Sequence, residues 1–225
     1  MARTRTRKTA PRAPARPPLK KAAAQGGSAA SSAPTTASTS WQALATTSRP
    51  GGTSRCTGLA VEPQQQTQWC WAAVSKSVSQ FYDSTSGWTQ CAIANAELSQ
   101  TGCCIDGSTP ACNQPWYLDR ALTRVGCLQA MSAGTLPFAM VQSLLNYDTP
   151  PCARQGWAGG GGHFVAIVCW FRFQSGLMSG SSAATASQRL QISDPWYGDS
   201  IVDYSTFVSG YQGTGTWTHS YLTKP

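Results

Sequence analysis

The hydrophobic pattern divides the chain into a helical part followed by a strand-rich part. Apolar positions at Val74, Val78 and Phe81 are spaced three to four residues apart, with serines and a lysine between them. This spacing predicts a helix whose first turn contains Cys70. Three further segments predict helices on the same grounds, and the second has a proline at its start and a glycine at its end: 92–100, 115–125 and 137–147.

The last third of the chain changes to a pattern of strands and turns. The run 163–171 is too apolar for anything but a buried strand. A second run, 190–194, would be its antiparallel neighbour, with residues 174–187 as the connection. Later strands are expected at 200–204 and 215–222. The order predicts an α+β fold, with a helical half first and an antiparallel sheet half second.

Cys70 lies between two tryptophans, in the sequence Trp-Cys-Trp-Ala-Ala, at the start of the first predicted helix. Unpaired backbone N–H groups and the positive end of the helix dipole favour a thiolate over a thiol at that position. Cys70 is therefore a candidate nucleophile. A buried or disulfide-bonded cysteine is the alternative that the local pattern leaves open.

Only two histidines are available as a base for such a nucleophile, His163 and His219. His163 opens the buried strand and follows four glycines, whose lack of side chains would let a substrate backbone approach closely. A flexible connector is the alternative interpretation of these glycines. His219 lies in an alternating late strand, where a surface or packed histidine is the better interpretation.

Asp194 ends the second strand-like run, directly before Pro195. If the two strands are antiparallel neighbours, the end of one lies beside the start of the other, and Asp194 then faces the ring of His163. A carboxylate in that position would hold the correct tautomer of a catalytic histidine. Aspartate before proline also favours a turn, and the two roles are compatible.

The order of these residues resembles that of the papain-like cysteine proteases. The resemblance rests on the spacing from Gln64 to Cys70, the Cys-Trp-Ala helix start, the Gly-His-Phe sequence at His163 and the Ser-Asp-Pro sequence at Asp194. It covers roughly residues 58–224. Within this superfamily the chain looks most like the compact bacterial proteases, which include secreted enzymes and effectors delivered into host cells. In papain itself, the third residue of the catalytic triad is asparagine, where this chain has Asp194.

The resemblance implies a papain-like fold, with the helix-start cysteine packed on the sheet half and an active-site cleft between the halves. It implies that Cys70 is the nucleophile, His163 the general base and acid, and Asp194 the orienting residue. Gln64 would be the oxyanion donor beside the backbone N–H of Cys70. The implied activity is peptide-bond hydrolysis through a thioester acyl-enzyme.

Trp71, Gly161 and Gly162 are expected to contact the substrate, a protein or peptide. Neither a metal nor another cofactor is implied, and a monomer is expected. Gln64 is chosen as the oxyanion donor on spacing alone, because three further glutamines lie close by: Gln65, Gln66 and Gln68.

Two other function classes fit the same residues. One keeps the fold and the chemistry but acts as an amidase on cell-wall peptides, or as a deconjugating protease that removes protein modifiers. The other is a non-catalytic binding protein whose basic tail supplies the affinity. The presence of every catalytic residue type weighs against this last class.

Charge separates the chain into two segments. Residues 1–55 contain ten Lys and Arg residues and no acid, whereas residues 56–225 contain seven against nine Asp and Glu, so that +10 and −2 give the net +8 of the chain. The first segment is rich in Ala, Pro, Ser and Thr and predicts a disordered tail ahead of one protease domain, 56–225. Nucleic acid is not expected to bind the domain, although the tail is suited to weak binding.

The tail also lacks the continuous apolar segment of a secretory signal, and no membrane span is evident in the sequence. Together with the resemblance, this predicts a protein that is secreted or delivered into a target cell without an ordinary signal peptide. A cytoplasmic location is the alternative.

Nine cysteines are many for a cytosolic enzyme. With Cys70 free, the other eight form an even set that is compatible with disulfides in an oxidising compartment. They are Cys56, Cys91, Cys103, Cys104, Cys112, Cys127, Cys152 and Cys169. Cys169 is alternatively a free core thiol on the strand face of His163. A zinc site in the segment 91–112 would lack both a Cys-x-x-Cys pair and a nearby histidine, so disulfides are preferred.

Overall fold

The computed structural model describes residues 52–173 and 187–225. Its helices in chain order are α1 (Cys70–Tyr82), α2 (Gln90–Leu98), α3 (Leu118–Arg124), α4 (Phe138–Asn146) and α5 (Tyr204–Ser209). Its strands are β1 (Gly52–Cys56), β2 (Leu128–Ala133), β3 (Cys152–Trp157), β4 (Gly162–Phe173), β5 (Ser187–Ser193), β6 (Ser200–Asp203) and β7 (Gly215–Thr223). The predicted α+β class is confirmed.

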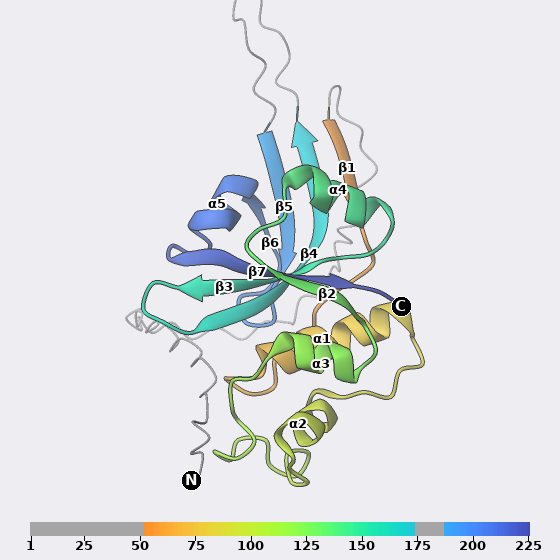
Figure 1. The fold of residues 1–225 in the computed structure, drawn as a ribbon, viewed down its shortest axis with the longest axis vertical. Helices are drawn as coiled ribbons and strands as arrows, with labels where there is room; N and C mark the ends of the chain where they lie inside the picture. The colour runs from red at the N-terminus through yellow and green to blue at the C-terminus, as the bar shows by residue number, and fades with distance from the viewer. Residues whose placement is uncertain (1–51, 174–186) are drawn as a thin grey trace, which may run out of the picture.

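All strands belong to one seven-stranded antiparallel sheet, in the order β2-β7-β3-β4-β5-β6, with β1 paired to β4. Figure 1 shows α1, α2 and α3 gathered on one side of this sheet, while α4 and α5 lie on the other. The helical part that comes first in the chain therefore forms a layer of its own against the sheet.

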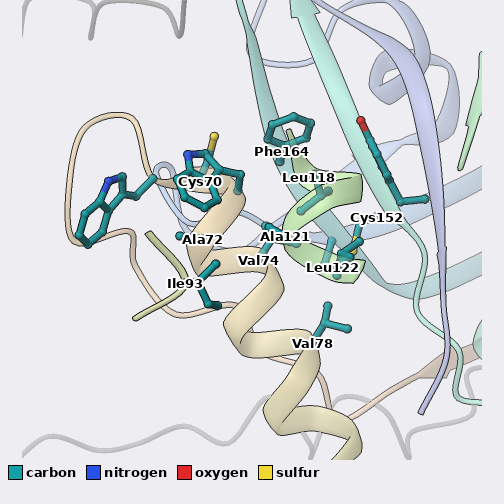
Figure 2. Close-up of a cluster of buried hydrophobic side chains, with 14 of the residues drawn as sticks. Cys70, Ala72, Val74, Val78, Ile93, Leu118, Ala121, Leu122, Cys152 and Phe164 are labelled. Atoms are coloured by element: carbon teal, nitrogen blue, oxygen red, sulfur yellow. The ribbon is translucent and has the colours of Figure 1, made fainter. Parts of the chain in front are cut away.

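Strand β4 separates two hydrophobic cores because its side chains alternate between the faces of the sheet. Phe164, Ala166 and Val168 pack with α1, α2 and α3, whereas Val165 and Ile167 pack with α4 and α5. Figure 2 shows the first core, in which Phe164 of the sheet lies beside Cys70 at the start of α1. This packing sets the position of the first turn of α1.

Helix α1 is more deeply buried than its amphipathic pattern predicts. Besides Val74 and Val78, the serines Ser75, Ser77 and Ser79 are also buried, because α1 lies between the other two helices of its layer and the sheet. Small serines fit this crowded position, and Ser77 Oγ bonds within the helix by donating to the carbonyl of Ala73 at 2.8 Å.

Each of the four predicted helices and four predicted strands has a counterpart, with shifted bounds. The helix expected from residue 115 begins at Leu118, because Tyr117 is still extended and serves as its N-cap. Helix α5 was not predicted and begins at Tyr204, which the sequence analysis assigned to a strand. Strands β2 and β3 were also not predicted, since β2 is almost fully exposed and neither has a strong alternating pattern.

Residues 52–55, which the sequence analysis assigned to the tail, form most of β1 and pair with β4. The remainder of the predicted tail lies outside the described residues. So does nearly all of the predicted connection 174–187. No helix in the described part of the chain is both long enough and apolar enough to cross a membrane.

Three disulfides are present within the described residues, and they correct the expected set of eight paired cysteines. The pairs are Cys56–Cys169, Cys91–Cys104 and Cys103–Cys112, whereas Cys70, Cys127 and Cys152 are free and buried. The pairs within the segment 91–112 occupy the four sulfur atoms that a zinc site there would have needed.

The alternative of Cys169 as a free thiol on the face of His163 is wrong. A register shift between Ile167 and Cys169 interrupts the regular pleat, so that Cys169 packs in the same core as Phe164. There it lies directly opposite Cys56 of β1, to which it is bonded.

We expect the Cys56→Ala/Cys169→Ala variant to lose about 2–4 kcal/mol of unfolding free energy, because this disulfide closes the longest loop of the three. Urea unfolding without reductant measures the loss. Cys127→Ala, which removes a buried thiol but no disulfide, is the matched control and should lose less. The same measurement in reductant should remove the difference in unfolding free energy between the double variant and the parent. If the full difference remained in reductant, the disulfide would not be its cause.

Candidate active site

Cys70 is the first residue of α1 and is 3 % exposed. The side chain of Trp69, the N-cap residue, makes no capping hydrogen bond, so it does not compete for the backbone N–H groups of the first turn. A helix start without a side-chain cap is suited to stabilise negative charge on a thiolate or on an oxygen atom beside it.

The two tryptophans that flank Cys70 anchor this helix start to the loop before α3. The indole N–H of Trp69 donates to the carbonyl of Cys112 at 2.8 Å, and that of Trp71 donates to the carbonyl of Gln114 at 3.0 Å. Both side chains are almost completely buried. The two tryptophans of the Trp-Cys-Trp sequence therefore have a structural role, since they fix the position of the cysteine from both sides.

His163 and Asp194 lie together, as the antiparallel arrangement of their strands predicted. Strand β5 pairs with β4 so that its last residue, Ser193, is opposite Ala166, and Asp194 follows immediately. His163 Nε2 and Asp194 Oδ1 are 2.7 Å apart. Both side chains are buried, so this bond is shielded from water.

The environment of His163 strongly favours the imidazolium. Burial on its own lowers the pKa of His163, but the negative charge and hydrogen bond of Asp194, together with a hydrogen bond to Cys70, raise it to about 10. Because Nε2 faces Asp194, Nδ1 is the ring nitrogen available to Cys70. Trp157 stacks on the ring at a centroid distance of 6.2 Å, and Tyr197 meets it edge-on at 6.1 Å.

Asp194 is held by three donors in addition to His163. Its Oδ1 accepts from the backbone N–H groups of Trp196 at 2.7 Å and Tyr197 at 3.0 Å, and its Oδ2 accepts from the Tyr211 hydroxyl at 2.7 Å. Burial tends to raise the pKa of Asp194, but His163 and these N–H donors outweigh it and lower the pKa. Asp194 thus both orients the histidine and forms the turn, the two roles that the sequence left compatible.

Tyr211 was not found by sequence reasoning. It follows α5 in a turn and is completely buried. Nothing in its local sequence distinguishes it from an ordinary core tyrosine, because its contact with Asp194 exists only once β5 and the segment after α5 are folded together.

The four glutamines near Cys70 fall into different environments. The backbone N–H of Gln64 donates to the carbonyl of Pro195 at 2.9 Å, which places Gln64 beside the Asp194 turn, and its Nε2 donates to the carbonyl of Gln66 at 2.7 Å. Gln65 is exposed, whereas Gln68 lines the cleft with Cys70. The side-chain amide of Gln66 lies against Gly107, which leaves Gln64 and Gln68 as the two candidates for an oxyanion donor.

A cleft opens beside Cys70 between the helical layer and the sheet. It is lined by residues from both halves: Gln68, Cys70, Trp71, Pro115, Trp116, Arg154, Gly162 and Phe164. Of the three substrate-binding residues expected from the sequence, Trp71 and Gly162 line this cleft, and Gly161 contributes a carbonyl to the side chain of Arg154. Gly160 and Gly161 have φ values of 89° and 87°, which favour glycine.

His219 is not part of this arrangement. Its Nδ1 lies 3.0 Å from Thr218 Oγ1, and it is only partly buried on β7. Burial and the positive charge of Arg154 lower the pKa of His219, so it is neutral near pH 7. The structure agrees with the interpretation of His219 as a packed histidine.

No family model and no curated protein matches this chain. What the site does is therefore inferred from its own geometry.

We expect Asp194→Asn to lower the pKa of His163 by removing the charge that raises it most. In the parent protein the imidazolium should persist until the pH approaches about 10. The charged His163 ring adds to the free energy of unfolding. This contribution is fully present below pH 6.5 and is lost as the pH rises through the folded-state pKa of about 10.

Proton NMR of the two histidine rings against pH measures the shift, with His219→Ala to assign the signals. Asp199→Asn is the matched control, because it removes a nearby carboxylate that, among the described residues, accepts a hydrogen bond from Ser193 Oγ and none from His163. An unchanged His163 titration in Asp194→Asn would contradict the assigned geometry.

Proposed function

We propose that the protein is a papain-like cysteine peptidase. The observation that supports this most directly is the chain of contacts from Asp194 through the buried ring of His163 to Cys70. Such a chain provides a nucleophile, a proton carrier and a group that orients the carrier. A helical layer that presents a cysteine at a helix start against an antiparallel sheet is compatible with the papain-like arrangement of halves.

In the proposed reaction, the thiolate of Cys70 attacks the carbonyl carbon of a peptide bond. A carbon–sulfur bond forms, and the carbonyl electron pair moves to oxygen to give an oxyanion. The imidazolium of His163 then donates its proton to the leaving amine as the carbon–nitrogen bond breaks. The product is a thioester between the acyl part of the substrate and Cys70.

Hydrolysis of the thioester uses the same groups, but His163 now acts as a base instead of an acid. The neutral imidazole of His163 accepts a proton from water while the water oxygen attacks the thioester carbonyl, and the thiolate leaves. Asp194 remains charged throughout, because its hydrogen bonds with Tyr211 and two backbone N–H groups stabilise the carboxylate. It acts by keeping the ring oriented and by stabilising the imidazolium.

The oxyanion would be stabilised at the start of α1, by the backbone N–H of Cys70 and a glutamine side chain. Gln64 is the proposed glutamine, because its backbone is tied to Pro195 next to the His163–Asp194 pair. One N–H of its side chain is used by the Gln66 carbonyl. The second N–H of the same amide group remains for the substrate.

We further propose that the enzyme acts outside a reducing cytoplasm. The three disulfides, one of which links β1 to β4, support an oxidising compartment.

An epoxide-type thiol protease inhibitor should label Cys70 and no other cysteine. Cys127 and Cys152 are the other free thiols within the described residues, and burial raises the pKa of both, so they are unreactive at neutral pH. Peptide mapping by mass spectrometry locates the label.

Cys70→Ala should abolish cleavage of casein and of a peptide library, whereas the matched variant Cys127→Ala should retain it. Cleavage by Cys70→Ala at the parent rate would refute the proposed nucleophile. Peptidoglycan fragments tested in parallel separate a peptidase from a cell-wall amidase of the same chemistry.

Gln64→Ala should lower kcat by about a hundredfold or more without unfolding the protein, as expected on removal of one oxyanion donor. Gln68→Ala is the matched control and should cost about tenfold or less, the value of one neutral hydrogen bond to the substrate. Steady-state kinetics on a peptide substrate measures both variants. If Gln68→Ala lowered kcat more than Gln64→Ala, Gln68 would be the oxyanion donor.

A further inference from the structure

Arg154 places a positive charge in the wall of the cleft that contains Cys70. It lies on β3, opposite Phe164 of β4, and both side chains line the cleft. Its guanidinium makes two hydrogen bonds, from Nη1 to Thr218 Oγ1 and from Nη2 to the carbonyl of Gly161, each 2.9 Å long. These bonds hold the group in one position at the cleft.

Two glycines make room for this guanidinium. Gly156 and Gly162 are partners across β3 and β4. A Cβ atom on Gly162 would lie 2.5 Å from Nη2 of Arg154, and one on Gly156 would lie 3.3 Å from Nη1. The last glycine of the run before His163 therefore accommodates Arg154, an explanation that the sequence did not suggest.

No carboxylate in the described part of the chain is paired with Arg154. Within residues 52–173 and 187–225 its two hydrogen-bond acceptors are neutral, and it belongs to none of the ion pairs. Three other arginines of this part are paired with acids: Arg55 with Asp148, Arg124 with Glu97 and Arg189 with Asp203. Arg120 and Arg172 instead lie over aromatic rings.

Among the described residues, the titratable groups near Arg154 do not form an ion pair with it, and the proposed thiolate of Cys70 in the same cleft already faces the imidazolium of His163. His219 lies opposite Arg154 on β7 and is neutral near pH 7. Asp119 of α3 tends to raise the pKa of His219, but among the described residues it makes no ion pair with Arg154. A partly buried cation without a partner is costly, and its cost is offset when a ligand brings the missing anion.

The geometry points to Arg154 as a specificity-determining residue that binds a carboxylate of the peptide substrate close to the scissile bond. The inference rests on the proposed peptidase function. Of the five N–H donors of the guanidinium, two are used within the protein, and those that remain can form the paired hydrogen bonds that arginine makes with carboxylates. An acidic side chain and a free chain terminus both offer this group.

Gln68 adds a second polar group to the same cleft wall. Its Oε1 is buried and has no hydrogen-bond partner among the described residues. A backbone N–H of a substrate lying in the cleft would satisfy this oxygen while its carboxylate met Arg154. The remaining wall is apolar and aromatic, formed by Trp71, Trp116 and Phe164, which strengthens a charge interaction by excluding water.

The test begins with cleavage profiling of a proteome-derived peptide library by the parent enzyme. From the best-cleaved sequence, matched peptides are made with Glu or Gln at each position near the scissile bond, and with a free or amidated C-terminus. We expect one position, or the free terminus, to raise kcat/KM by about tenfold or more over its neutral counterpart, the value of a charge-assisted hydrogen bond.

In Arg154→Gln this ratio of acidic to neutral peptide should fall to near one. Arg154→Lys should keep a preference for the acid, although a smaller one because lysine lacks the planar pair of donors. Arg172→Gln, on the neighbouring strand but bonded to Gln142 away from the cleft, is the matched control and should leave the ratio unchanged.

An unchanged ratio in Arg154→Gln, or a parent enzyme indifferent to acids at every position and at the terminus, would overturn the inference. The Glu and Gln positions distinguish a side chain from a chain terminus as the source of the carboxylate. Thermal unfolding and labelling of Cys70 show whether each variant is folded.

Binding measured by calorimetry with the Cys70→Ala protein separates this inference from the proposed function. If the parent protein cleaves no library peptide, matched Glu and Gln peptides drawn from the uncleaved library are used for calorimetry instead. If the acidic peptides then bind more tightly than the neutral ones, and Arg154→Gln removes that difference, the binding role of Arg154 stands and the peptidase proposal fails. If cleavage occurs without any preference for acids, the opposite conclusion follows.

Discussion

Strand β4 is the element on which the rest of the structure depends, because it pairs with β3 and β5 and carries side chains into both cores. Phe164 reaches the helical layer beside Cys70, while the next residue along the strand packs toward α5. His163 lies near the start of this strand, within reach of groups from both sides. The disulfide to Cys56 ties a further strand to the other end of β4.

The proposed catalytic groups come from segments that lie far apart in the chain and are positioned by different forces. Cys70 is placed by burial of α1 and by the two indole hydrogen bonds on either side of it. His163 and Asp194 are placed by antiparallel backbone pairing, and Tyr211 then fixes the free side of the carboxylate. Such a site combines rigid supports with a buried ion pair, which pre-organises the histidine before any substrate arrives.

Burial serves two opposite purposes among the ionisable groups of this protein. For Cys127 and Cys152, burial raises the pKa of the thiol, which favours the unreactive protonated form. For His163, the neighbouring carboxylate outweighs the cost of burial and favours the charged ring. Arg154 differs from both, since it is a fixed charge at a cleft with only neutral acceptors from the protein. The proposed nucleophile and the proposed carboxylate-binding residue therefore line the same cleft.

The local sequence was sufficient to predict the helices and strands that form because of their own pattern of apolar residues. The helix from Cys70 follows from its apolar spacing, and the strand from His163 follows from its length and apolarity. The meeting of His163 and Asp194 was predictable too, because antiparallel pairing of two consecutive strands places the end of the second beside the start of the first.

Other features depend on contacts between distant segments, and only the tertiary structure decided them. The register shift before Cys169, the pairing of Cys56, the role of Tyr211 and the guanidinium held between Gly156 and Gly162 have no local signature. Each arises because backbone pairing and packing place side chains from different strands together, and side-chain identity along one segment does not encode its partner in another.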